Sequence, residues 1–497
     1  MSDLLPNGVG ATSMTDVRKA EDGPEDVKDP LLSALTNETE PPDEGALKEA
    51  AKTGDDAATG GPPAGRSSID EAKRKGPVGW LQLLGPGLIT GASDDDPSGI
   101  GTYAQVGSQF GYGLLWTALF TFPLMAAVQE MCGRIALQTG VGLGVSLRRK
   151  FPTWLVGAAV LGLVVANTIN LGADLGAVAA GGALLSRGAV KALWLVVPIA
   201  LLILSMQVFA TYGLIFRVFK WLTIVLFAYV IAGFLAHPQL VEVLKGTFVP
   251  HIELSKGFAM ALVAVLGTTI SPYLFFWQAS SEVDEMKAAG LHGEKARRGV
   301  TRSELRAARV DILIGMGFSN LIMYFIILTS AAVLHAHGKT DIQSAEQAAS
   351  ALAPLAGQFA FVLFAGGLIG TGLLAIPILS GSATYALKEF IGFKGTLAYR
   401  PRYRLTFYII LGLATAAGAA MSFLHIDPIR ALFITAVING VVAPPLLVLI
   451  VLLGSDRHYM KNMASGRLSR VLCWVTTAAM AAAALAMFAS LLRPSNG

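Results

Sequence analysis

The chain has 497 residues, of which 53% are hydrophobic and only 14% are charged. Because soluble domains carry roughly 25% charged residues, this composition argues against an ordinary soluble domain and indicates a protein that crosses a membrane many times. The formal net charge of +4 is small and gives no support for nucleic-acid binding. Cys132 and Cys473 lie far apart in apolar stretches, so they provide neither a disulfide framework nor a cysteine metal site.

Residues 1–75 differ in composition from the remainder of the chain. They are rich in Asp, Glu, Gly, Pro, Ala and Ser and nearly devoid of aromatic residues. Such a segment buries too little apolar surface to offset the entropy lost on ordering. We therefore predict a disordered cytoplasmic tail at 1–75 and a transmembrane domain at 76–497.

A spanning helix needs about 20 mostly apolar residues. Eleven segments meet this requirement: 79–109, 112–137, 153–183, 190–208, 212–236, 256–280, 308–335, 355–388, 405–424, 429–454 and 467–492. We interpret the first ten as two repeats of five, at about 79–236 and 256–454, followed by one extra helix at 467–492.

Lys and Arg residues predict the orientation, because cytoplasmic loops carry an excess of them. They gather at 148–150, 297–309, 394–404 and 457–461, whereas the alternate loops hold at most two each. This pattern predicts a cytoplasmic N-terminus and, with an odd number of spans, an outer C-terminus. The expected location is a bacterial inner membrane.

The first predicted span is interrupted by "GASDDDPSGIG", Gly91–Gly101. An ionised Asp at the centre of a spanning helix costs about 2.5–3.5 kcal/mol on insertion scales, so three in succession must face protein, water or an ion. Pro97 removes a backbone donor, and Gly99 eases departure from helical geometry. We expect two half-helices joined by an unwound stretch around Asp96 to Gly99.

The sixth predicted span is interrupted in a similar way, by "GTTISP" at Gly267–Pro272. Paired breaks at matching positions of two halves are typical of transporters built from inverted repeats, with the substrate site near the bilayer midplane. The alternative is a pair of ordinary proline kinks. Kinks do not require carboxylates, so the acids of the first break favour the transporter interpretation.

These residues resemble the NRAMP family of divalent metal transporters, in which Gly-Pro-Gly precedes the signature Asp-Pro-Gly-Asn at the spacing seen in "GPGLITGASDDDPSG". The similarity extends over about residues 79–490. It implies an all-α membrane protein with the LeuT-like fold, eleven helices and an inverted five-plus-five repeat. It also implies a transporter rather than an enzyme, with no cofactor and with a divalent cation as substrate.

Family members hold the metal with the Asp and Asn of the first segment and with a backbone carbonyl and a Met of the sixth. Asp96 matches the Asp, whereas Ser98 and Gly99 replace the signature Gly and Asn. In the sixth segment Thr268 stands at the carbonyl position, and Ser271 replaces the Met. The resemblance therefore implies a metal site without its soft ligand.

Oxygen ligands suit Mg²⁺, Ca²⁺ and Mn²⁺, whereas a thioether favours softer metals. Because Mg²⁺ keeps several waters, it is usually held by one or two carboxylates. We predict inward transport of a hard divalent cation, Mg²⁺ before Mn²⁺, by alternating access. The departures resemble the NRAMP-related magnesium transporter branch, in which the Met is likewise absent.

Proton coupling in the family uses an Asp and a Glu one turn apart on the third segment and a His on the sixth. Here Asp174 remains, but Ala177 and Tyr273 occupy the places of the Glu and the His. Tyr is a poor proton carrier at neutral pH compared with His. We therefore expect transport without proton coupling.

Four further polar residues have two interpretations each. Asp94 and Asp95 would attract cations in a vestibule or cap the unwound stretch. Gln278 and Asn439 would line the cavity or hydrogen-bond a neighbouring helix.

Three other functions of the protein stay open: an ordinary proton-coupled Mn²⁺ or Fe²⁺ transporter, a sodium-coupled amino-acid transporter on the same fold, and a non-transporting membrane sensor. The expected partners are the cation and the lipid bilayer, with protein partners unknown.

Overall fold

The computed structural model describes residues 85–209, 226–253, 255–291, 293–342, 344–393, 405–424 and 427–492. Within these ranges the chain forms helices joined by turns, and no β-strand is present. The predicted tail, part of the fifth predicted span and the basic loop at 394–404 lie outside the described residues.

Long apolar stretches become helices because a helix satisfies every backbone N–H and C=O internally where water is absent. The longer helices are α6 (Pro97–Phe110), α7 (Trp116–Thr139), α9 (Thr153–Leu185), α10 (Ala192–Phe209), α14 (Lys256–Thr269), α15 (Pro272–Ala288), α17 (Arg302–Val333), α20 (Ala360–Ile391), α21 (Leu405–Met421), α22 (Pro428–Gly454) and α24 (Arg467–Leu492). The shorter ones are α5 (Pro86–Asp94), α8 (Leu143–Lys150), α12 (Phe227–Leu235), α13 (Leu240–Phe248), α16 (Glu294–Arg297), α18 (Ala345–Ala349), α19 (Ala353–Ala356) and α23 (Arg457–Met460), with 3₁₀ turns between several of them.

Each of the eleven predicted spans contains at least one helix in the described ranges. By length and apolar composition seven described helices qualify as spans, with α14 and α15 counted together, and eight qualify if α6 and α7 are taken as one bent pair at 107°. Fewer helices qualify as spans than the eleven predicted, for three local reasons. The first span is interrupted, the fifth is only partly described, and α21 is a shorter apolar helix.

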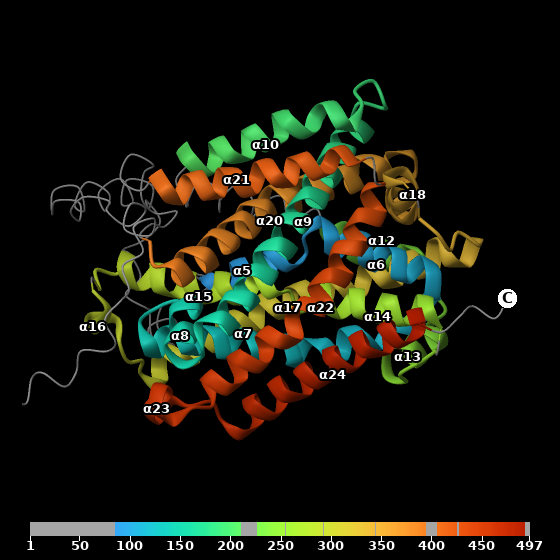
Figure 1. Cartoon of the computed structure of the whole chain (residues 1–497). Helices are drawn as coiled ribbons and strands as arrows, with labels where there is room; N and C mark the ends of the chain where they lie inside the picture. The colour runs from blue at the N-terminus through green and yellow to red at the C-terminus, as the bar shows by residue number, and fades with distance from the viewer. Residues whose placement is uncertain are drawn as a thin grey trace, which may run out of the picture. The chain divides into compact units, whose positions relative to one another are not determined.

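Several helices occupy corresponding places in the two predicted repeats and contact the same neighbours. In Figure 1, α10 and α21 run side by side, and each also contacts both α9 and α20. Similarly, α5 packs against α17, while α15 packs against α7. The extra helix α24 packs against α14, α22 and α7. Both interrupted spans are thereby held among long continuous helices.

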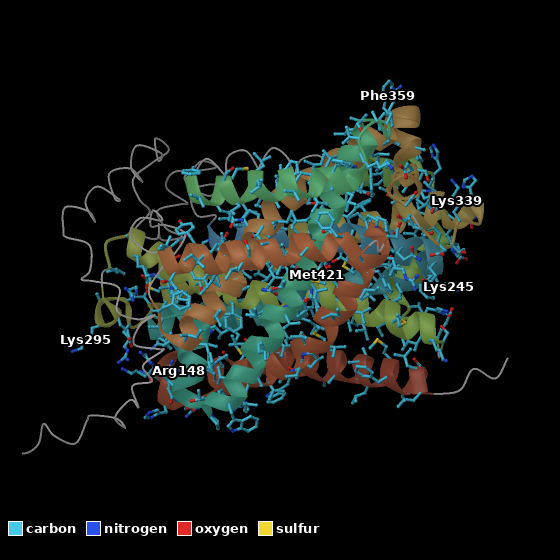
Figure 2. All side chains as sticks on the ribbon, turned by 45° about the horizontal axis from the view of Figure 1, so that its top comes forward. Arg148, Lys245, Lys295, Lys339, Phe359 and Met421 are labelled. Atoms are coloured by element: carbon cyan, nitrogen blue, oxygen red, sulfur yellow. The ribbon has the colours of Figure 1, made fainter. Side chains whose placement is uncertain are left out.

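Charged residues separate to the two ends of the bundle. Figure 2 shows Arg148 and Lys295 at one end and Lys245 and Lys339 at the other. The first end also carries α16 and α23 (Figure 1). Arg148, Lys295 and α23 therefore lie at one end of the bundle, and which side of the membrane this end faces stays a prediction.

A carboxylate on α17 fixes the start of α5. Asp311 accepts hydrogen bonds from the backbone N–H groups of Gly85 at 3.0 Å, Gly87 at 2.7 Å and Leu88 at 3.0 Å. The first N–H groups of a helix have no partner within it, and a carboxylate also complements the positive end of the helix dipole. Asp311, which the sequence analysis did not single out, therefore holds the first half-helix against α17.

The sixth span approaches α22 closely enough to require glycine. A Cβ added to Gly267 of α14 would lie 2.1 Å from the carbonyl oxygen of Ala436 and 2.3 Å from the backbone nitrogen of Gly440. Both neighbours are backbone atoms, so they cannot move aside as a side chain would. Small residues at helix contacts allow this kind of close approach in membranes.

We expect Gly267→Ala to destabilise the protein, because overpacking a core costs about 1–3 kcal/mol and here the obstructing atoms belong to a helix backbone. The measurement is the melting temperature of the detergent-solubilised protein. Gly162→Ala on α9 is the matched control, since its added Cβ would find its nearest neighbour at 3.8 Å. Equal melting temperatures for both variants would contradict the close contact of α14 and α22.

Candidate metal centre

Both predicted breaks are present, and each lies directly before a proline. α5 ends at Asp94 and α6 begins at Pro97, while α14 ends at Thr269 and α15 begins at Pro272. Proline fits the first position of a helix, where its missing N–H is not needed. The first break therefore comprises Asp95 and Asp96, shorter and earlier than the predicted stretch from Asp96 to Gly99, because Pro97 already starts the next helix.

Asp96 is buried at the start of α6 and accepts four hydrogen bonds. Its Oδ1 accepts from the Gly99 backbone N–H at 2.7 Å and from the Ser98 hydroxyl at 2.6 Å. Its Oδ2 accepts from Asn170 at 3.1 Å and from the Tyr273 hydroxyl at 3.4 Å. Oδ1 thus caps the helix, while the longer contacts of Oδ2 come from side chains of two other helices.

Oxygen atoms from the two breaks meet beside Asp96. Ser98 Oγ lies 3.4 Å from Thr268 Oγ1, and Ser271 Oγ donates to the Thr268 carbonyl oxygen at 2.7 Å. Ser271 also contacts the carbonyl oxygen of Gly267 at 3.0 Å. The structure therefore brings the predicted ligands Asp96, Ser98, Thr268 and Ser271 into one connected group.

Gly99 contributes space to this group. Its backbone N–H is bonded to Asp96, and an added Cβ would lie 3.3 Å from the Tyr103 ring and 3.4 Å from Thr268 Oγ1. Such distances are tighter than most Cβ contacts. A glycine at this position lets α6, the helix after the first break, approach the Thr268 hydroxyl of the second break.

Tyr273 joins the two interrupted spans. Its hydroxyl lies 2.8 Å from the carbonyl oxygen of Ser93, at the end of α5, in addition to its contact with Asp96. Its own backbone carbonyl accepts a hydrogen bond from Ser382 of α20 at 2.6 Å. The phenol thus occupies a position beside the carboxylate, as its place in the sequence pattern predicts.

Asp94 and Asp95 are both fully buried. The Ser319 hydroxyl of α17 lies 2.6 Å from Asp94 Oδ2 and 3.3 Å from Asp95 Oδ1. This arrangement favours a role in closing the break over exposure in an open vestibule. Sequence reasoning did not find Ser319, because a single serine in an apolar helix carries no distinguishing pattern.

The third span presents three polar residues on one face of α9. Asn167, Asn170 and Asp174 follow the helical spacing of three and four residues and are all buried. The groups that act on the Asp174 carboxylate are the backbone N–H of Ser98 and the Asp96 carboxylate, both from the start of α6. Asn170 was missed, although this spacing was a signal that could have found it.

Gln278 and Asn439 differ in their surroundings. Gln278 accepts a hydrogen bond from Thr90 of α5 at 2.6 Å and donates to Glu282 at 3.1 Å, so it links the two interrupted spans. Asn439 of α22 is buried, and neither polar atom of its side chain has a partner among the described residues. Gln278 therefore bonds a neighbouring helix, as one of its two interpretations proposed.

The described part of the chain holds no group of three or more His, Cys, Asp or Glu side chains arranged to bind a metal. The centre instead offers one carboxylate with hydroxyl, amide and carbonyl oxygens around it. Oxygen sets of this kind suit hard cations, which retain part of their water shell.

Two broken helices in a helical membrane bundle are typical of secondary transporters. The sequence profile described as "Natural resistance-associated macrophage protein-like" (Nramp) matches residues 87–490. The chain belongs to this family, as its first and sixth spans predict, and it is accordingly a transporter and not an enzyme.

Two curated relatives carry the name "Divalent metal cation transporter MntH". The protein from Klebsiella pneumoniae (strain 342) is 27% identical over 406 residues, covering 80% of this chain and 91% of the relative. The protein from Caldanaerobacter subterraneus is 25% identical over 394 residues, covering 79% and 89%.

Solved structures share the fold. A mutant of the manganese transporter from Eremococcus coleocola superposes with a TM-score of 0.64 at 17% identity, over 94% of this chain and 93% of the other. The nucleobase-cation-symport-1 family transporter Mhp1 gives a TM-score of 0.51 at 15% identity, over 82% and 92%. These similarities confirm the predicted LeuT-like fold.

Proposed function

We propose that the protein carries a hard divalent cation into the cell by alternating access, Mg²⁺ before Mn²⁺, without proton coupling. Divalent cation transport is supported by the relatives named for it. The preference for a hard ion is supported by the side chains at the two breaks.

The observation that carries the proposal is the chemistry of the sixth-span break. Ser271 and Thr268 present a hydroxyl and a carbonyl oxygen 2.7 Å apart, beside the Ser98 hydroxyl that binds Asp96. Residue 271 itself carries no thioether to select soft metals, and the sulfur of Met323 on α17 contacts the neighbouring Thr269 hydroxyl at 3.6 Å. We assign Asp96 as the main charge partner, with Ser271, the Thr268 carbonyl and water completing a six-coordinate shell, the geometry that Mg²⁺ demands.

The surroundings of Asp96 also support transport without protons. The group that contacts its Oδ2 from the sixth span is a phenol, Tyr273, which does not release a proton at neutral pH as readily as His. One turn after Asp174 the third span carries Ala177, which has no titratable group. We infer that the cation moves down its own gradient.

Competition between cations tests the proposed substrate. We expect millimolar Mg²⁺ to reduce the uptake of Mn²⁺ into proteoliposomes, because a site made of oxygens gives Mn²⁺ little advantage over Mg²⁺. Protein-free liposomes provide the control. If millimolar Mg²⁺ leaves Mn²⁺ uptake unchanged, the result favours the alternative function of an ordinary Mn²⁺ or Fe²⁺ transporter.

Internal pH tests the proposed lack of proton coupling. We expect the lumen of the proteoliposomes, followed with a pH-sensitive dye, to hold its pH while Mg²⁺ or Mn²⁺ enters. Asp174→Asn should retain most of the uptake, because the amide keeps the size and a hydrogen-bonding capacity of the side chain. Acidification that scales with uptake and disappears in Asp174→Asn would show that coupling persists.

We also propose a bacterial inner-membrane location with a cytoplasmic N-terminus and an outer C-terminus, from the Lys and Arg distribution. Single cysteines introduced at Lys295 and Lys339, at opposite ends of the bundle (Figure 2), would test the orientation. A reagent that does not cross membranes should label the cysteine at 339 in intact cells and leave the one at 295 unlabelled.

A further inference from the structure

A basic pocket lies away from the metal centre, at the end of the bundle that carries Arg148 and Lys295 (Figure 2). Its volume is about 340 Å³, within the size range of small-ligand sites. None of its residues belongs to the candidate metal centre. The lining residues are Gln138, Thr139, Ser146, Arg149, Arg298, Gly299, His458, Tyr459 and Lys461.

Positive charge dominates this pocket. Arg149, Arg298 and Lys461 line it. Among the described residues Glu294 is paired with both arginines, at 2.7 Å each, and the nearby Asp456 is paired with Lys150. The hydrogen bonds from Arg149 hold the pKa of Glu294 at about 2, so it stays ionised at physiological pH. Its single negative charge leaves the three cations with a net positive charge. His458 adds a further ring nitrogen to the lining.

The walls of the pocket are fixed by hydrogen bonds between distant parts of the chain. Glu294 engages both terminal nitrogens of Arg149, at 2.7 and 2.8 Å. Tyr459 donates to the carbonyl oxygen of Arg149 at 2.6 Å, and the Gly299 N–H donates to the Gln138 carbonyl at 3.0 Å. These contacts connect α7 and α8 with the segments before α17 and after α22. The side chains of Arg149 and Arg298 are therefore held in place by Glu294.

Lys461 reaches the pocket from a strained turn. Its φ angle is +48°, in the left-handed region that favours glycine. A residue with a side chain rarely adopts this conformation. The turn places Lys461 in the same lining as Arg149 and Arg298, and a bound anion would reduce the repulsion among these cations.

We propose that this pocket binds a phosphate-bearing anion. Guanidinium groups match phosphate oxygens with paired hydrogen bonds, and among the described contacts Arg298 uses only one terminal nitrogen, to bond Glu294. Basic pockets between membrane helices on the cytoplasmic side suit anionic lipid headgroups. The same chemistry also suits a soluble phosphate compound. Since the walls come from both repeats, a bound anion would hold the two halves together at this end.

Thermal stability of the purified full-length protein in detergent tests the proposal. The probes are dioleoyl phosphatidylglycerol, dioleoyl phosphatidylcholine, ATP without added metal, and sodium chloride matched for ionic strength. We expect phosphatidylglycerol or ATP to raise the melting temperature above the phosphatidylcholine and chloride values. Stabilisation by lipid alone identifies a headgroup site, and stabilisation by ATP identifies a soluble ligand.

Lys461→Gln should weaken the binding of the active probe about fivefold, since one basic residue near an anionic surface contributes about 1 kcal/mol. The matched control is Lys245→Gln at the opposite end of the bundle (Figure 2), which should leave binding unchanged. Native mass spectrometry counts bound lipid or ATP independently of folding stability. The proposal is overturned if no probe stabilises the protein, or if both lysine variants bind the active probe as the unmodified protein does.

Discussion

Asp96→Ala is expected to abolish uptake of divalent cations while leaving the protein folded. The carboxylate is the only one that contacts groups from the first, third and sixth spans among the described residues, through Ser98, Asn170 and Tyr273. Losing the helix cap costs about 0.5–2 kcal/mol, which a large membrane domain should withstand. Pro97 keeps the break in place without the carboxylate. Proteoliposome uptake of Mn²⁺ and Mg²⁺ measures the effect.

Asp96→Asn separates the charge from the cap. The amide oxygen can still accept from the Gly99 N–H, as the aspartate does at 2.7 Å, so α6 should begin normally. Without the negative charge a divalent cation loses its main partner, and uptake should again be lost. Asp94→Asn should be milder, because Asp94 is bonded to Ser319. Near-normal uptake by Asp96→Asn would show that the cation binds at another place in the protein.

The positions of both breaks could be predicted from the sequence, because acids, hydroxyls and a proline inside an apolar segment carry a large energetic cost there. The residues at which each break begins and ends could not be predicted from the sequence. Whether Asp96 ends one helix or caps the next depends on its own backbone angles, which are extended, and the carboxylate caps α6. The cap itself is local, because Asp96 accepts from Ser98 and Gly99, whereas the Oδ2 partners Asn170 and Tyr273 come from other helices.

The partners of the acids were less predictable than the acids themselves. Asn170 and Ser319 reach the first break from helices more than 70 residues away in sequence. Periodicity places Asn170 on a polar face of α9, but it does not say which helix that face meets. Asp311 likewise caps α5 across 224 residues. Long-range helix packing supplies this information, and one sequence without relatives does not contain it.

Ser271→Met is expected to shift the preference of transport toward Mn²⁺ and softer ions by about tenfold relative to Mg²⁺, which corresponds to about 1.4 kcal/mol. The substitution replaces a hydroxyl that lies 2.7 Å from the Thr268 carbonyl by a polarizable thioether. A thioether binds soft and borderline metals but gives Mg²⁺ little in return. The ratio of Mn²⁺ to Mg²⁺ uptake, measured in the same proteoliposomes, reports the shift.

Ser271→Ala is the matched control, because it removes the hydroxyl without adding sulfur. Its uptake should fall for both ions, while its ratio of Mn²⁺ to Mg²⁺ stays close to that of the unmodified protein. If the Met side chain acted only through its size, the uptake of both ions would decrease together and the ratio of Mn²⁺ to Mg²⁺ uptake would not change. A ratio that is equal in the Met and Ala variants would therefore remove Ser271 from the coordination shell. It would leave Asp96 with the Thr268 carbonyl as the remaining assigned ligands.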